Sequence, residues 1–208
     1  MARADDVRAI VPGGAAAPAG IPADIFAAAV DTFAAGQRLD MRSLARRLGV
    51  GRATLYRRAG NRERLLDELL WWRARRLLAD QVRASAELAG TVRLVAVIGG
   101  VLRAVAGDRP LRAFLESDPE TALRLLTGSR SRVHRGMLSA LEKLIDTERN
   151  SGCFDTSLDT PTLAYAITRI SEGFLYADVI ADRAPDAERA STVIEALLAG
   201  LDRRSAPV

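Results

Sequence analysis

The residues best suited to chemistry in this sequence are arginines, which gather between residues 37 and 80. That segment holds 12 arginines and 5 acidic residues, a net charge of +7, whereas the whole chain has a net charge of +4. A guanidinium keeps its charge at physiological pH and can bind two oxygens of a phosphate at once. A basic segment on a chain whose remainder is acidic therefore predicts one surface that binds a polyanion.

Residue types that commonly support catalysis or metal binding are scarce. One histidine, His134, and one cysteine, Cys153, cannot make the usual zinc site, and the sequence has no HExxH pattern. We therefore expect no metal, no cofactor and no enzymatic activity; the enzymatic alternative is a site built from carboxylates alone. A single cysteine cannot form a disulfide within the chain, which fits a reducing cytoplasm.

Two short helices are predicted to carry the arginines. Asp40 suits the N-cap of the first, and the apolar side chains that follow recur at helical spacing, as Met41, Leu44, Ala45 and Leu48. Gly49 is expected to end this helix. The second runs from about residue 52 to 59, and Asn61 is predicted to cap a long helix after it. Two short helices joined by a glycine-bearing turn, apolar inside and basic outside, make a helix-turn-helix.

The rest of the chain also has helical periodicity, so the predicted fold class is all-α. Residues 1–20, rich in Ala, Gly and Pro, are expected to be a disordered tail. A three-helix head is predicted over residues 21–66 and a helical body over 67–208. The expected helices of the body, after the one that begins at Asn61, are 91–106, 109–116, 119–127, 131–150, 159–181 and 186–203.

The segment "MRSLARRLGVGRATLYRRAGNRERL" resembles the TetR family of bacterial transcriptional repressors. The likeness covers roughly residues 24–70 and depends on "LARRLGV", "TLYR" and "NRERLL" in this order and spacing. It implies that the head binds DNA, with the second short helix in the major groove. The residues it assigns to DNA contact are Arg42, Ser43, Arg52, Ala53, Thr54, Tyr56, Arg57, Arg58 and Arg62.

Two positions depart from the family's pattern. Gly51 stands where a Ser or Thr is usual and removes a side-chain cap, and Ala59 replaces a usual aromatic. The alternatives for the basic residues also stay open. An arginine-rich helix face is most often only solvated, and Arg57 and Arg58 could pair with Glu63 or Asp67. A DNA-binding protein without sequence specificity is the alternative function, but it leaves the large acidic body unexplained.

For the body, the resemblance implies ligand binding and dimerisation through the last two long helices. Candidate dimer contacts on their apolar faces are Ile170, Phe174, Ala177, Val193, Leu197 and Leu201. A ligand pocket is expected among the central helices, where Gly99 and Gly100 could leave room for the ligand or mark a kink. Its candidate lining residues are Val97, Ile98, Val101, Phe114, Leu115, His134, Leu138, Tyr165 and Thr168. The alternative for each is ordinary core or surface packing.

The expected function is a ligand-responsive regulator, a repressor, that binds a pseudo-palindromic operator in double-stranded DNA as a homodimer. A small apolar effector would release it. The segment "LYRRAGNRERLL" and the two tryptophans after it are similar to the QsdR-like subgroup of the family, which implies a lactone or acyl-chain effector. The longest apolar run, residues 94–102, is far too short to span a bilayer, so no membrane association is expected. The location is predicted to be cytoplasmic, in keeping with the single cysteine.

Overall fold

The computed structural model describes residues 7–11, 18, 20–177, 181, 183 and 185–204. This part of the chain is helical and contains no strand, which confirms the all-α prediction. The elements in chain order are α2 (Ala23–Ala34), α3 (Met41–Arg47), α4 (Arg52–Ala59), α5 (Arg62–Ala84), α6 (Gly90–Ala106), α7 (Arg109–Ser117), α8 (Pro119–Thr127), α9 (Arg132–Asn150), α10 (Thr160–Glu172), the π-helix η1 (Gly173–Ala177) and α12 (Ala187–Leu201).

The chain folds into two compact units. The first, called the head unit below, comprises Ala15–Ala74 and Asp108–Arg135; the second, the body unit, comprises Met1–Gly14, Arg75–Gly107 and Gly136–Val208. The division differs from the expected boundary at residue 66. The first half of α5 belongs to the head, and so do α7 and α8, which the sequence pattern placed in the body.

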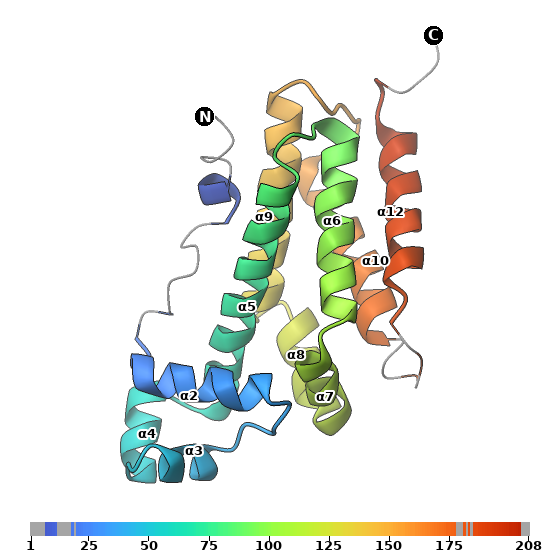
Figure 1. The fold of residues 1–208 in the computed structure, drawn as a ribbon. Helices are drawn as coiled ribbons and strands as arrows, with labels where there is room; N and C mark the ends of the chain where they lie inside the picture. The colour runs from blue at the N-terminus through green and yellow to red at the C-terminus, as the bar shows by residue number, and fades with distance from the viewer. Residues whose placement is uncertain are drawn as a thin grey trace. The chain divides into compact units, whose positions relative to one another are not determined.

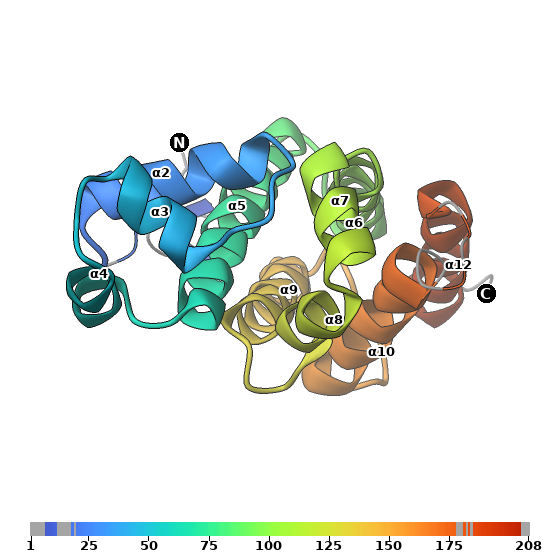
Figure 2. The ribbon, with the colours of Figure 1, turned by 90° about the horizontal axis from the view of Figure 1, so that it is seen from below.

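In the head unit, α3 packs on α2 and α4, and α2 meets the first half of α5 through Phe26 and Trp72, whose rings lie edge to face at 5.6 Å between centroids (Figures 1 and 2). The core of this unit consists mainly of aliphatic side chains, such as Ile25, Leu44, Leu55 and Leu65. Aromatic contacts explain why α7 joins this unit. The rings of Phe33 and Phe114 meet edge to face at 6.0 Å between centroids, a geometry that aromatic quadrupoles favour.

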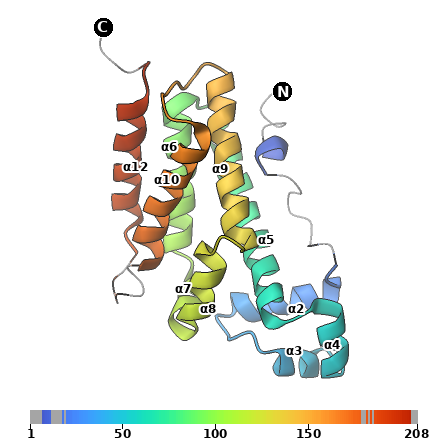
Figure 3. The same cartoon turned by 180° about the vertical axis from the view of Figure 1, so that it is seen from behind.

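In the body unit, α6, α10 and α12 lie side by side (Figure 3). Two glycines of α6 allow this close approach, and α6 continues through them without a break. A Cβ on Gly99 would lie 2.8 Å from the Ser191 hydroxyl oxygen, and one on Gly100 would lie 2.0 Å from the Gln81 side-chain oxygen. These glycines therefore allow neighbouring side chains to approach α6, and they mark neither a ligand space nor a kink.

An ion pair lies inside the body unit between Arg93 of α6 and Glu148 of α9. The two charged groups are 2.7 Å apart, and each side chain is only 3% exposed. Glu148 also accepts a hydrogen bond of 2.6 Å from the amide of Gly90. Gly90 has a φ of +61°, and a Cβ there would lie 2.2 Å from the carbonyl oxygen of Cys153. The start of α6 is thus fixed to the end of α9 by polar contacts, and the close approach and left-handed backbone at Gly90 require glycine.

The N-terminal region differs from the expected tail. Residues 7–10 form one helical turn, and Ile10 and Val11 are buried in the hydrophobic core of the body unit. The structure thus differs from the expected tail at residues 7–11, where burial of two large aliphatic side chains offsets part of the entropy lost on ordering the segment. Residues 1–6, 12–17 and 19 lie outside the described part.

The expected helix over 159–181 is shorter in the structure. It is α-helical only to Glu172, and the π-helix η1 follows to Ala177. Residues 178–180 lie outside the described part.

Among the described helices, none is by itself long and apolar enough to cross a membrane; only α6 and α7 taken together, as a bent pair, reach the required length and composition.

Candidate nucleic-acid interface

The supporting helix α3 begins at a strong cap. The Ser43 amide donates a 2.8 Å hydrogen bond to the Asp40 carboxylate, as predicted. This backbone hydrogen bond, with a second from the Ser43 hydroxyl, lowers the pKa of Asp40. Met41 and Leu44 point into the core, so Arg42 and Ser43 lie on the exposed side. The cap fixes where α3 begins, and the apolar spacing sets the face that meets solvent.

The turn between the short helices has the geometry that glycine supplies. Gly49 has a φ of +65° and follows the last residues of α3, while the Val50 amide donates to the carbonyl of Ala45 at 3.1 Å. Gly51 then occupies the N-cap of α4 with an extended backbone and no side-chain cap. The absence of a side-chain cap at Gly51 is expected from the sequence. It leaves the amides at the start of α4 without a capping side chain.

The helix α4 turns one face inward and the other outward. Leu55 and Ala59 are fully buried. Arg52, Ala53, Arg57 and Arg58 are exposed, Thr54 is half-buried, and Tyr56 is 47% exposed. A tyrosine ring that is half open to solvent can place its hydroxyl against a phosphate while its ring packs on the protein.

The outward arginines of α3 and α4 fall into two groups. In the described part of the chain, Arg42, Arg52, Arg57 and Arg58 have no ion-pair partner. Arg47 is engaged, because it pairs with Asp31 of α2 at 2.8 Å and so holds α3 on α2. The free guanidinium groups are concentrated on α4, where they can bind an anion without breaking an existing contact.

The acidic residues near α4 do not neutralise these arginines. Glu63 pairs with Arg124 of α8 at 2.7 Å, and Asp67 accepts hydrogen bonds of 3.0 and 3.1 Å from the amide of Arg132. The alternative in which Arg57 and Arg58 pair with Glu63 or Asp67 is therefore wrong. Both carboxylates serve to attach α5 to α8 and α9.

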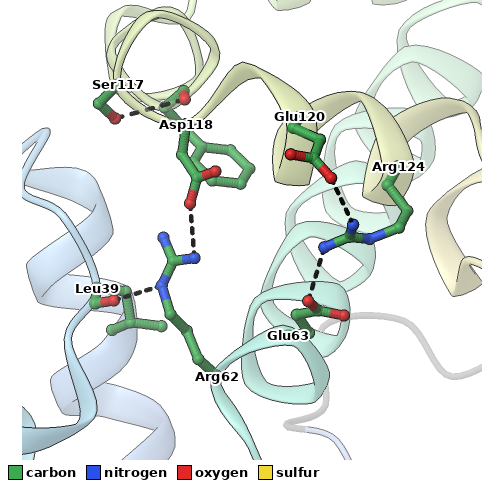
Figure 4. Close-up of polar contacts among 8 residues, drawn as sticks. Leu39, Arg62, Glu63, Ser117, Asp118, Glu120 and Arg124 are labelled. Atoms are coloured by element: carbon green, nitrogen blue, oxygen red, sulfur yellow. Dashed lines mark hydrogen bonds and ion pairs between the residues drawn. The ribbon is translucent and has the colours of Figure 1, made fainter.

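Arg62 differs from the other residues assigned to DNA contact. Its Nε donates to the carbonyl of Leu39 at 2.6 Å, and its Nη1 lies 2.7 Å from the Asp118 carboxylate (Figure 4). Its side chain is only 21% exposed. The structure thus places Arg62 in an intramolecular contact, because a carboxylate 56 residues away in the sequence competes for the same guanidinium. Asp118 itself could not be identified from local sequence pattern.

The expected ligand-binding residues are divided between the two units. Val97, Ile98, Val101, Leu138, Tyr165 and Thr168 belong to the body unit, whereas Phe114, Leu115 and His134 belong to the head unit. Tyr165 is 52% exposed, with the Arg169 guanidinium 5.0 Å from its ring centre, so it lies on the surface of α10. The Thr168 hydroxyl donates to the Ala164 carbonyl within the helix. Tyr165 therefore faces solvent, whereas Thr168 is half-buried.

The expected dimer contacts share a partly open face of the body unit. Val193 is 40% exposed, and Ile170, Phe174, Leu197 and Leu201 are half-buried. An open groove of about 610 Å³ lies here, with Ile170, Gly173, Phe174 and Val193 among its lining residues. Ala177 ends η1, but its side chain lies outside the described part.

Comparisons with known proteins agree with this architecture. Residues 25–69 match the family model described as bacterial regulatory proteins, tetR family, and residues 89–199 match the model described as tetracyclin repressor-like, C-terminal domain. No curated protein matches the chain significantly.

Three solved structures are similar in fold. The transcriptional repressor QsdR of R. erythropolis, from the TetR family, is 30% identical and has a TM-score of 0.71; the match covers 88% of this chain and 98% of that one. The regulator FadR of Bacillus subtilis, in complex with stearoyl-CoA, is 21% identical with a TM-score of 0.58, covering 84% and 96%. The fatty acid degradation regulator FadR of Bacillus halodurans is 22% identical with a TM-score of 0.59, covering 85% and 97%.

Proposed function

This chain belongs to the TetR family of bacterial transcriptional regulators, and on that premise we propose that it is a repressor that binds a pseudo-palindromic operator as a homodimer. One observation supports DNA binding above the others. The outward face of α4 carries Arg52, Arg57 and Arg58, exposed and without ion-pair partners among the described residues. Since the family consists of transcriptional regulators, the enzymatic alternative is set aside.

The proposed division of contacts follows from the position of each residue on the head. The N-terminal residues of α4, Arg52, Ala53 and Thr54, would reach base edges in the major groove. Tyr56, Arg57 and Arg58, together with Arg42 and Ser43 of α3, would bind the phosphate backbone. Backbone contacts set the position and strength of binding, and base contacts set the sequence preference.

The proposed effector is a small apolar molecule that binds the body and lowers operator affinity. The likeness to the repressor QsdR supports the repressor assignment. The lactone or acyl-chain class of effector is the one that the sequence resemblance implies. An effector acts only through unequal affinity for the DNA-binding and released states of the protein. Its binding site is assigned to the body, and we expect the protein to act in the cytoplasm.

Titration of the protein's own upstream DNA with increasing salt tests the DNA-binding proposal. We expect a protected operator in footprinting, and an operator affinity that falls steeply with salt because arginines displace counterions from phosphates. At every salt concentration the operator should be bound about 10³-fold or more tightly than unrelated DNA of equal length. An equal affinity for both DNAs would favour the non-specific architectural protein. Repeating the footprint with hydrophobic lactones and acyl-chain compounds then tests the effector class.

Dimerisation through α10, η1 and α12 has its own test. We expect a dimer by sedimentation equilibrium at micromolar concentration without DNA, since the half-open apolar face of Val193 and Leu197 would be covered by a second copy. Val193→Asp should place a charge in that interface and give monomers. Val92→Asp, the same change at a valine of α6 that is 63% exposed, is the matched control and should remain dimeric. A monomeric wild type, or a dimeric Val193→Asp variant, would contradict the assignment.

A further inference from the structure

The start of α5 is attached to the α7–α8 junction by one arginine that contacts two other segments of the head. The Arg62 guanidinium contacts the Leu39 carbonyl, in the loop before α3, and the Asp118 carboxylate, between α7 and α8 (Figure 4). The side chains of Arg62 and Asp118 are 21% and 17% exposed. Three segments of the head unit therefore meet at one side chain that solvent reaches only in part.

The carboxylate of Asp118 is held in its charged form. Its burial alone would raise its pKa, but hydrogen bonds from Thr121 and Arg62, and the charge of Arg62, lower the pKa below the ordinary value. A contact with Leu39, itself almost fully buried, adds directional constraint to the charge attraction. Fixed geometry and partial burial both strengthen a charge-assisted hydrogen bond. The Arg62–Asp118 contact should therefore stabilise the head unit more than an ordinary surface ion pair does.

Further polar contacts along α5 involve the same partner segments. Glu63 pairs with Arg124 at 2.7 Å, and the nearly buried Glu68 pairs with Arg132 at 2.9 Å. Arg73 pairs with Asp108, which also caps α7. The first three turns of α5 and the segment from Asp108 to Arg132 are therefore joined at several points, with the Arg62 contact nearest to α4.

We propose that Arg62 is a positioning residue for α4, the recognition helix of the helix-turn-helix. Its contacts with Leu39 and Asp118 form a brace through which α7 and α8 hold α4 in place. The helix-turn-helix lies in the chain between Leu39 and Arg62, so a side chain that joins these two points closes the segment on itself. A phosphate would have to compete with Asp118 for the charge of a guanidinium that is only 21% exposed, and drawing Arg62 away would leave a partly buried carboxylate without its cation.

The brace also gives α7 and α8 a role in DNA binding. These helices contain none of the residues assigned to DNA contact, yet they follow α6 and precede α9, which extends into the body unit. A change in α7 or α8 would alter the support of α4 without touching DNA. This inference rests on the proposed function, because its main readout is operator affinity.

The variant Asp118→Asn distinguishes a positioning role of Arg62 from a phosphate contact. Asn keeps the size of the side chain and an oxygen that accepts hydrogen bonds, but it removes the charge. Loss of a negative charge from a DNA-binding protein ordinarily strengthens binding through the phosphate field. The brace predicts the opposite, an operator affinity about tenfold weaker. Arg62→Ala should give a similar loss, and the double variant should lose no more than either single one, because both remove one shared interaction.

The salt dependence of operator binding distinguishes positioning from phosphate contact. For Asp118→Asn and Arg62→Ala, we expect the slope of log affinity against log salt to equal that of the wild type. Arg58→Ala, the matched control on the outward face of α4, should reduce the slope by about one. A slope reduced by Arg62→Ala, or a tighter operator complex with Asp118→Asn, would overturn the brace. A wild type without operator preference would instead refute the proposed function.

Amide hydrogen exchange without DNA provides a readout that depends on neither the operator nor the effector. In Asp118→Asn, the amides of α4 should exchange about tenfold faster than in the wild type, while those of α6 and α12 should be unchanged. Faster exchange throughout the molecule would show general destabilisation in place of a local brace. Unchanged exchange in α4 would show that the recognition helix does not depend on Asp118, and would overturn the inference.

Discussion

Glu148→Ala should lower the free energy of unfolding by about 3–5 kcal/mol, the largest loss of stability that we expect from any single side chain. The substitution would leave the Arg93 guanidinium charged inside the body unit, where it is 3% exposed and its charge would no longer be balanced by the carboxylate 2.7 Å away. It would also remove the acceptor for the Gly90 amide. Chemical denaturation at fixed protein concentration measures the loss, because dimerisation adds to apparent stability.

Glu142→Ala on the same helix is the matched control. Glu142 is half-buried and has no ion-pair partner among the described residues, so its loss should change the free energy of unfolding by less than about 0.5 kcal/mol. Replacing both members of the pair by apolar residues should restore part of the stability, since the buried charge is then absent. Equal stability of Glu148→Ala and Glu142→Ala would show that Arg93 finds other compensation.

Arg52→Ala should weaken operator binding by about 1–3 kcal/mol and relax the base preference at one position in each half-site. Arg52 opens α4, is exposed and has no ion-pair partner in the described part of the chain. Arginine at this end of a recognition helix can bind guanine with two hydrogen bonds in the major groove. Affinity for a set of single-base operator variants, measured at one salt concentration, gives both quantities.

Two variants separate this effect from general electrostatics. Tyr56→Ala should weaken binding to all sequences alike, because its proposed partner is a phosphate. Arg130→Ala removes an exposed arginine in the loop before α9, outside the helix-turn-helix, and should leave the base preference unchanged. If Arg52→Ala lost affinity equally for operator and unrelated DNA, its assignment to a base contact would be wrong.

Local signals in the sequence were sufficient for the helices and for the outward face of the head. Asp40 and Asn61 cap α3 and α5 by accepting hydrogen bonds from amides three residues later, and Gly49 takes the left-handed backbone that ends α3. Each signal acts within a few residues, so it can be recognised in the chain alone. The apolar spacing around Leu55 likewise determines which side chains of α4 face outward, because a helix repeats every 3.6 residues.

Only the tertiary structure decided which residues far apart in the sequence contact one another. Arg62 matches a phosphate-contact position by sequence, yet Asp118, 56 residues later, holds it inside the head unit. Arg93 directly precedes an apolar run in the sequence, yet its ion pair with Glu148, 55 residues later, allows it to be buried. The same holds for Ile10 and Val11 in the body core, and for α7, which joins the head through Phe114. A charge or an apolar side chain takes whichever partner the folded chain brings near, and no periodicity or cap records a partner that distant.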